Sequence, residues 1–267
     1  MEKHKILRLE NGNIHYWINK NADNKVCLFF SHGVTADHRC FEKQIEYFQN
    51  QYTTIRWDIP MHGLSKEYEF KSYKDCANLM NEIIVNENID KVVLIGFSLG
   101  GYPSQMFIKL FPEKVLGFIA IDTTPFGLKY YSKADVFWLE QVEWMAKCFP
   151  TNLLKRSMAK SVSYTKESYQ FMMKMYQGSS KNEIAKQMRI AYGRFIEENK
   201  DINIQCPVLI LLGEYDKVGK VKKYCYDWSK TTNFLMKIIE KASHFANFDN
   251  SEMVNEKIHS FVKELVK

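Results

Sequence analysis

The sequence lacks long apolar runs and an export signal. No stretch of about 18 or more apolar residues occurs in its 267 residues, so no transmembrane helix is expected. The first ten residues, MEKHKILRLE, contain no apolar core and no cleavage site, so a secretory signal is not predicted either. These two absences lead us to expect a cytoplasmic protein without a membrane span.

Metal-binding patterns are missing as well. The six cysteines form no CxxC pair and the seven histidines show no spacing such as HExxH, so no metal site is predicted. Cysteines spread singly through apolar segments are typical of reduced thiols in a cytosolic protein rather than of a disulfide framework. They are Cys27, Cys40, Cys76, Cys148, Cys206 and Cys225.

Charge and arginine content exclude further classes. The net charge is +6, but the basic residues are mostly lysines interspersed with acids, and the densest group, residues 217–223, is typical of a solvated helix face. Nucleic-acid binding is therefore not expected. Arginine is scarce, with six residues against 31 lysines, which disfavours a site that clamps several carboxylates. The hydrophobic fraction of 46% is enough for the large core of one α/β domain.

Short apolar runs alternate with helical segments along most of the chain. Alternating residues around Asn11-Gly12 predict a hairpin of strands 5–10 and 13–18. Further strands are expected at 25–30, 53–57, 92–96, 115–122, 207–213 and 233–240, and helices at 38–50, 72–87, 99–111 and 250–265. This alternation is typical of an α/β fold, with a mostly parallel sheet and helices on both faces.

Residues 125–200 break the alternation. They contain no convincing strand, and we expect three or four helices inserted between the strand that ends near Asp122 and the strand that begins at Pro207. Half of the twelve methionines lie here, beside many aromatic residues. Plain helix packing is one interpretation, and a helical cap with an apolar underside is the preferred one. The predicted organisation is a core of residues 1–124 and 201–267 with a cap at 125–200.

The pentapeptide Gly96-Phe97-Ser98-Leu99-Gly100 follows the predicted strand VVLIG and precedes a predicted helix. In this context G-x-S-x-G is typical of a nucleophile held on a strained turn between strand and helix. Larger residues at the two glycine positions would collide with neighbouring backbone. The turn would also point the amide of Leu99 toward a reacting carbonyl. Ser98 is therefore the predicted nucleophile.

Two later loops carry the residues expected to activate Ser98. Asp216 follows the strand PVLILLG, and His244 lies between the last predicted strand and the last helix. A carboxylate placed in this way can fix the tautomer of a histidine that acts as general base. Asp122, at the end of the preceding strand, is the rival acid. Asp249 is expected to begin or cap the final helix.

Two further loop motifs follow strands of the first half. In Ser31-His32-Gly33-Val34 the sharp turn allows the amide of Val34 to face an oxyanion, whereas His32 belongs to the turn itself and is expected to be structural. In DIPMHGLS, the proline and glycine shape a loop whose amides Asp58 can bind. Asp58 and His62 are therefore interpreted as scaffold residues.

Through SHGV, DIPMHGLS, GFSLGG, GEYD and ASHF the chain resembles the α/β-hydrolase superfamily over residues 25–122 and 205–265, and it looks most like the small, capped esterases and lactonases. The resemblance implies an eight-stranded, mainly parallel sheet, an inserted cap and chemistry without a cofactor. It also implies a triad of Ser98, Asp216 and His244, in the chain order of this superfamily, and an oxyanion hole from the amides of Val34 and Leu99. The expected pocket residues are Phe97, Phe126, Trp138, Met172 and Tyr176.

Three hypotheses for the function follow. The favoured one is a serine hydrolase that cleaves a small-molecule carboxylic ester or thioester through an acyl-enzyme. The second keeps the triad but cleaves carbon–carbon bonds or eliminates pyruvate from a carboxylate-rich substrate, which would need positioned arginines such as Arg39, Arg189 or Arg194. The third is a ligand-binding protein that retained the fold and lost fast chemistry.

Overall fold

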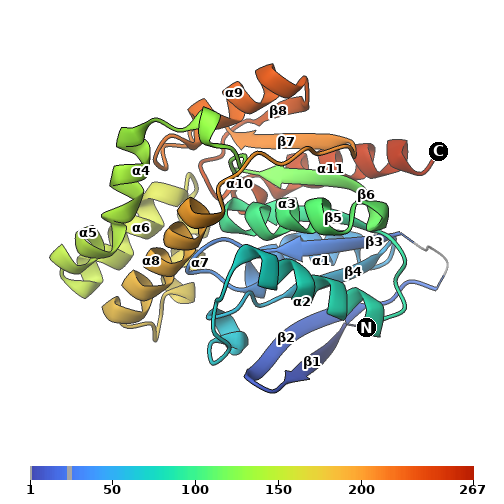
Figure 1. Ribbon diagram of the computed structural model, residues 1–267, viewed down its shortest axis with the longest axis horizontal. Helices are drawn as coiled ribbons and strands as arrows, with labels where there is room; N and C mark the ends of the chain where they lie inside the picture. The colour runs from blue at the N-terminus through green and yellow to red at the C-terminus, as the bar shows by residue number, and fades with distance from the viewer. Residues whose placement is uncertain (1, 23–25) are drawn as a thin grey trace.

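The computed structural model describes residues 2–22 and 26–267, and its centre is one eight-stranded sheet (Figure 1). The strand order is β1-β2-β4-β3-β5-β6-β7-β8. Strands β3 to β8 are parallel, whereas β2 pairs antiparallel with both β1 and β4. The bounds are β1 Lys3–Leu9, β2 Gly12–Asn19, β3 Cys27–Ser31, β4 Thr53–Trp57, β5 Val92–Phe97, β6 Val115–Ile121, β7 Val208–Gly213 and β8 Leu235–Ile239.

The central strands are buried on both faces, so their side chains divide between two apolar clusters with a period of two residues. In β5, Val92 and Leu94 join the cluster beneath α2, α3 and α9, whereas Val93 and Ile95 join the cluster beneath α1, α10 and α11. These helices are α1 Glu42–Phe48, α2 Tyr73–Asn86, α3 Gly101–Leu110, α9 Val221–Thr232, α10 Ala246–Asp249 and α11 Ser251–Leu265. The predicted α/β fold, with helices on both faces of a mostly parallel sheet, is confirmed.

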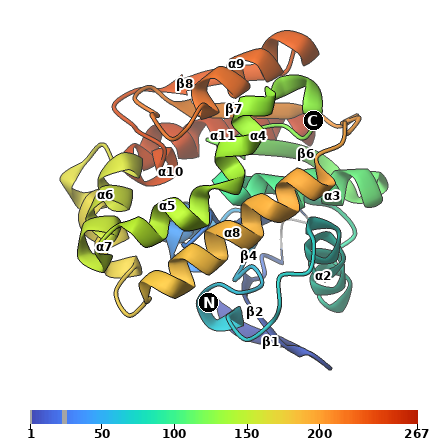
Figure 2. The same ribbon diagram turned by 60° about the vertical axis from the view of Figure 1, so that its left-hand side comes forward.

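The segment between β6 and β7 holds five α-helices rather than the three or four expected: α4 Lys133–Glu140, α5 Val142–Cys148, α6 Thr151–Val162, α7 Lys166–Met175 and α8 Lys181–Glu198. Gln141, which separates α4 from α5, keeps helical backbone angles. The break between these two helices is therefore slight, and the sequence did not predict it. The five helices gather at one end of the sheet, and the turned view shows α4, α5 and α8 in front of the strands (Figures 1 and 2).

Most element boundaries fall within two residues of the prediction. The strand expected at 25–30 begins at Cys27, and Lys25 lies outside the described residues. The last strand begins at Leu235 rather than at Asn233, because Asn233 takes a left-handed conformation that ends α9. The first half of the helix expected at 38–50 is a 3₁₀ turn, His38–Phe41. None of the helices in the described part of the chain is long and apolar enough to span a membrane.

Candidate active site

Ser98 occupies the turn between β5 and α3 with a φ angle of +49°. A positive φ is strained for a serine, and such strain is characteristic of a nucleophile at the end of a buried strand. The turn leaves Ser98 partly exposed, although both of its neighbours in the chain are buried. The predicted strained turn at Ser98 is therefore present.

The glycines around Ser98 are required by close approach of other chain segments. A Cβ atom at Gly100 would lie 1.9 Å from the carbonyl oxygen of Ser31, and one at Gly96 would lie 2.6 Å from the Cα of Gly101. Neither distance is possible for a real Cβ, and the atoms that would be hit are backbone. The collision expected at the two glycine positions of the motif is thus confirmed.

Three side chains from distant loops meet at this turn. The imidazole Nε2 of His244 lies 2.9 Å from the hydroxyl oxygen of Ser98, and its Nδ1 lies 2.9 Å from Oδ2 of Asp216. The other carboxylate oxygen of Asp216 accepts a hydrogen bond from the amide of Val218 at 2.8 Å. His244 and Asp216 are almost fully buried, at 4% and 5% exposure, whereas Ser98 is accessible. The arrangement can pass a proton from the serine to the histidine.

Asp122 lies beside this triad without contacting the histidine through a hydrogen bond. Its backbone is also strained, with a φ of +44°, and its Oδ1 accepts a hydrogen bond from the amide of Gly213 at 2.7 Å. Its Oδ2 has no hydrogen-bond partner among the described residues. Burial away from water, and then the negative charge of Asp216, raise the pKa of the Asp122 carboxyl well above its ordinary value. Of the two rival acids, Asp216 is therefore the one that contacts the histidine.

The SHGV loop lies directly against the serine turn. A Cβ atom at Gly33 would meet the Phe97 ring at 2.9 Å and the Cβ of Ser98 at 3.4 Å, so only glycine permits this approach. Val34 follows immediately and lines the cavities beside Ser98, as Leu99 does for one of them. The loop thus brings the backbone of residue 34 close to Ser98, where the sequence predicted an oxyanion hole.

His32 and His62 are buried parts of the loop scaffold. His32 donates from Nδ1 to the carbonyl of Gly33 and accepts at Nε2 from the amide of Ile59. His62 donates to the carbonyl of Pro60, and its burial, followed by the nearby ring of His32, lowers the pKa of His62 to about 3. Burial lowers the pKa of His32 as well, so both imidazoles are neutral at neutral pH, and neither forms a hydrogen bond with Ser98.

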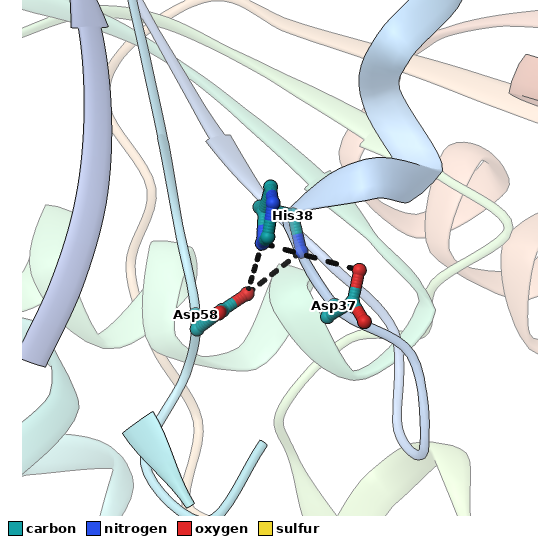
Figure 3. Close-up of side chains that lie close together, drawn as sticks. All are labelled: Asp37, His38 and Asp58. Atoms are coloured by element: carbon teal, nitrogen blue, oxygen red, sulfur yellow. Dashed lines mark hydrogen bonds and ion pairs between the residues drawn. The ribbon is translucent and has the colours of Figure 1, made fainter. Parts of the chain in front are cut away.

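The cluster of Asp37, His38 and Asp58 is already filled by hydrogen bonds (Figure 3). Asp58 accepts from both the amide and Nδ1 of His38 at 2.8 Å and from the amide of Leu64 at 2.7 Å. Asp37 is held in a two-pronged ion pair with Arg39. A metal ion would have to displace these partners, so the cluster is better described as the structural loop anchor that the sequence predicted for Asp58.

The second group of potential ligands is Asp122, Asp216 and His244. Both ring nitrogens of His244 are already used, one by Ser98 and the other by Asp216. A cation here would break the link between the histidine and the serine. The donor set therefore fits proton transfer better than metal binding.

Two small cavities open beside Ser98, and both are lined by Val34, Ser98, Tyr192, Val218 and His244. The first, here called the tyrosine-side cavity, has a volume of about 100 Å³ and is also lined by Tyr102, Tyr131, Leu139, Phe195 and Tyr224. The second, the methionine-side cavity, has a volume of about 110 Å³ and is also lined by Phe97, Met158, Val162, Met172, Tyr176 and Met188. A larger cleft of about 670 Å³ beside Asp37 and His38 contains none of the three triad residues.

Three of the five expected pocket residues, Phe97, Met172 and Tyr176, line the methionine-side cavity. The prediction for Trp138 is wrong: its side chain on α4 is 58% exposed and lies against Phe137. The prediction for Phe126 is also wrong, because its ring packs into the core against Tyr73 and Phe195 and lines neither cavity. Hydrophobicity within the inserted segment could not separate residues on its underside from those on its outer surface.

The arginines considered as carboxylate clamps pair with acids elsewhere. Arg189 contacts Glu143, and Arg194 contacts Glu197, both on the inserted helices. Arg39 is held by Asp37, as described above. None of the three lines either cavity beside Ser98.

The prediction for Asp249 is wrong, because Asp249 ends α10 and Asn250 caps α11. The carboxylate of Asp249 instead accepts from the amide of Ser243 at 3.0 Å and from the amides of Tyr164 and Thr165 at 2.9 and 2.8 Å. It therefore ties the loop that carries His244 to the turn between α6 and α7. Sequence reasoning missed this link because the two segments are about 80 residues apart in the chain.

A family model described as "alpha/beta hydrolase fold" matches residues 27–251. The chain belongs to this family. The match includes the β3 strand, the Ser98 turn, Asp216 and His244, so the fold predicted from the motifs is confirmed. Its description fixes no substrate.

Two relatives match nearly the whole chain at low identity. A Haemophilus influenzae protein, provisionally named an esterase/lipase, is 24% identical over 251 residues, which are 92% of this chain and 86% of that protein. A Legionella pneumophila (strain Paris) pimeloyl-[acyl-carrier protein] methyl ester esterase is 25% identical over 256 residues, 94% of this chain and all of that protein. A solved esterase from Thermogutta terrifontis shares the fold with a TM-score of 0.79 at 16% identity, over 98% of this chain and 99% of that one.

Proposed function

We propose that the protein is a serine hydrolase that cleaves a small carboxylic ester or thioester through an acyl-enzyme. The observation that carries the proposal is the continuous contact from Asp216 through His244 to Ser98, with 2.9 Å at each step. The esterase names of the two relatives support ester cleavage as the reaction class.

The geometry suggests the roles of the three residues. Nε2 of His244 takes the proton of Ser98 as the hydroxyl oxygen attacks the carbonyl carbon, and Asp216 stabilises the imidazolium that forms. The tetrahedral intermediate then expels the alcohol or thiol, which leaves with the proton held on His244. In the second half, His244 takes a proton from water as the water oxygen attacks the acyl-enzyme carbonyl, and it returns that proton to the hydroxyl oxygen of Ser98 as the acid is released.

The negative oxygen of each tetrahedral intermediate needs donors that are already in place. We assign this role to the backbone amides of Val34 and Leu99. The approach of Gly33 to Ser98 supports the assignment, because it holds the neighbouring amide close to the nucleophile. Hydrogen bonds of this kind are worth about 3–4 kcal/mol of transition-state stabilisation.

We assign residues 125–200 as a cap over the site. Helices α6, α7 and α8 supply side chains to the methionine-side cavity, while the core supplies Ser98 and His244. The two cavities are far smaller than the roughly 300–1,000 Å³ of drug-sized binding sites, so the expected substrate is small. Neither cavity contains an arginine, and Lys220, which lines the tyrosine-side cavity, is paired with Asp135, which favours a simple ester over a substrate rich in carboxylates.

The test is a panel of acyl esters and matched thioesters of increasing chain length, assayed with the wild type and Ser98→Ala. We expect short acyl groups to be cleaved fastest and Ser98→Ala to lower kcat by about 10³-fold or more. Thermal unfolding of both proteins provides the control, since the substitution should leave the fold intact. An unchanged rate in rigorously purified Ser98→Ala would refute the proposal.

The panel also separates the two remaining alternatives. Much faster turnover of a dicarboxylate than of any simple ester would favour the carbon–carbon hydrolase or lyase. Complete inactivity toward every ester and thioester, together with tight binding of one of them, would favour the ligand-binding protein. The cytoplasmic location and the independence from a cofactor stay predictions.

A further inference from the structure

Tyr192 joins the two cavities beside Ser98. It projects from α8 of the inserted segment, is partly exposed, and lines both the tyrosine-side and the methionine-side cavity. The other four residues with this property are Val34, Ser98, Val218 and His244, of which Ser98 and His244 are assigned to the chemistry and Val34 to the oxyanion hole. Tyr192 is therefore the one tyrosine of the described residues that lines both cavities.

The hydroxyl of Tyr192 differs from those of its neighbours because no residue of 2–22 or 26–267 forms a hydrogen bond with it. The hydroxyl of Tyr102 is bonded to Thr124 Oγ1 at 2.7 Å, and that of Tyr131 donates to the carbonyl of Pro125 at 2.6 Å. A phenol in a protein interior ordinarily finds such a partner. Tyr192 therefore keeps a free donor on a side chain that lines both cavities.

The protonation state of Tyr192 suits a donor. Burial raises the pKa of Tyr192 above its ordinary value of 10, so the phenol keeps its proton near neutral pH. The surrounding wall of the methionine-side cavity is apolar, with Met158, Val162 and Met172. A hydrogen bond formed beside this apolar wall competes with water less than one on the open surface.

We propose that Tyr192 determines specificity by donating a hydrogen bond to an oxygen of the substrate next to the scissile ester, where the two cavities meet. The inference rests on the proposed hydrolase function and names its substrate class: small esters in which one arm is short and apolar and the other carries an ether, hydroxyl or carbonyl oxygen within a few bonds of the reacting carbonyl. The apolar arm occupies the methionine-side cavity, and the oxygen-bearing arm lies toward the tyrosines.

Two pairs of esters of equal size test this proposal, because the members of each pair differ only in an oxygen that replaces a methylene group. Methyl methoxyacetate against methyl butanoate places the oxygen on the acyl arm, and 2-methoxyethyl acetate against butyl acetate places it on the alcohol arm. For each pair the measured quantity is the ratio of kcat/KM for the oxygen-containing ester to that for its hydrocarbon partner. Intrinsic reactivity cancels when this ratio is compared between wild type and variant.

Tyr192→Phe removes the hydroxyl and keeps the ring. We expect it to lower the ratio about 3- to 10-fold for one of the two pairs, the size of a single neutral hydrogen bond, and that pair identifies the oxygen-bearing arm. The loss should fall mainly on KM, because the oxygen is bound equally before and during reaction. The unfolding midpoint should not fall, since no bond within the protein is lost.

Tyr73→Phe is the matched control, since it removes a buried phenol that donates to the carbonyl of Ala191 on α8 and lines neither cavity. It should lower the unfolding midpoint and change both members of a pair by the same factor. The proposal is overturned if Tyr192→Phe leaves both ratios unchanged, or if it lowers kcat equally for all four esters, which would make Tyr192 part of the general machinery. Failure of the underlying hydrolase function looks different: the wild type would then cleave none of the four esters.

Discussion

The two regions that meet at Ser98 differ in burial and in charge. The core strands that lead to Ser98 and Asp216 are buried along their whole length, and residues 1–124 and 201–267 contain 24 basic and 24 acidic residues. Residues 125–200 contain 13 basic and seven acidic residues, and so carry the entire net charge of +6. They also hold five strongly exposed aromatic side chains: Phe137, Trp138, Trp144, Phe149 and Tyr164.

This difference separates two tasks. A buried sheet with paired strands holds Ser98, His244 and Asp216 within hydrogen-bond distance of one another, because shifting any one of them would disturb the core. The inserted helices are joined to the core by separate contacts, among them that of Asp249 with the α6–α7 turn and that of Tyr73 with the carbonyl of Ala191. We infer that the core sets the chemistry and that the insert sets which substrates fit.

The largest expected effect comes from a substitution in the core that removes catalytic activity and changes no residue of the insert. Asp216→Asn should lower kcat by about 10⁴-fold, because His244 loses the group that fixes its tautomer and stabilises its charge. Asp122→Asn is the matched variant, and it should cost less than about tenfold, since Asp122 makes no hydrogen bond to His244. A larger loss from Asp122→Asn than from Asp216→Asn in steady-state kinetics would reverse the assignment of the acid.

The next effect tests how tightly the core is packed. Gly100→Ala places a Cβ atom 1.9 Å from the carbonyl oxygen of Ser31, which cannot move without breaking the sheet. We expect a loss of about 3 kcal/mol or more in the free energy of unfolding, or failure to fold. Urea unfolding followed by circular dichroism measures it. A variant as stable as the wild type would show that the serine turn is looser than described.

The third prediction concerns the pH dependence of stability. All seven histidines lie outside residues 125–200, so their titration reports on the core. The pKa of His62 falls from 6.5 in the unfolded chain to about 3 in the fold, so the unfolded state binds more protons below pH 6.5. Stability is therefore fully present above pH 6.5 and is lost as the pH falls toward 3, by about 2 kcal/mol at pH 5 from this one residue.

The check is the change in unfolding free energy between pH 7 and pH 5, measured for the wild type and for His62→Asn. Asparagine keeps a donor for the carbonyl of Pro60 but does not titrate, so the change should shrink by about 2 kcal/mol. The absolute stability of the variant does not matter for this difference. An identical pH dependence in both proteins would mean that His62 binds a proton as readily in the fold as in the unfolded chain.

The smallest effect tests the insert and has the opposite sign to that at Gly100. Gly193 lies inside α8, and a Cβ atom there would meet nothing within 4 Å. Gly193→Ala should raise the unfolding free energy by about 0.5–1 kcal/mol, since alanine favours the helix. Differential scanning calorimetry should show the midpoint rising by about 2–3 °C. A fall in the midpoint would mean that α8 packs more tightly than its surroundings suggest.

The same comparison explains what the sequence could predict. Apolar runs such as VVLIG and PVLILLG mark buried strands, and motifs at their ends mark Ser98, Asp216 and His244, because a parallel sheet brings its strand ends to one edge. The helices of the insert are half-buried, so hydrophobicity did not show which residues face the site. Trp138 and Phe126 were misassigned for this reason, and Tyr192 was missed because a single tyrosine in a helix carries no spacing signal.

The sequence also did not predict contacts between segments that are distant in the chain. The role of Asp249 depends on residues about 80 positions away, and the unpaired hydroxyl of Tyr192 is defined by the partners that it lacks. The residues around Asp249 and Tyr192 in the sequence do not indicate either property. Only the folded arrangement of the core and the insert reveals them.

The most direct test of the account is whether the hydroxyl of Ser98 is chemically activated. The protein is treated with a fluorophosphonate probe, and intact mass and peptide mass spectrometry locate the adduct. The account predicts one adduct on Ser98 in the wild type, strongly slowed labelling in His244→Ala, and none in Ser98→Ala. Labelling at another residue, or no labelling of a folded wild-type protein, would contradict it.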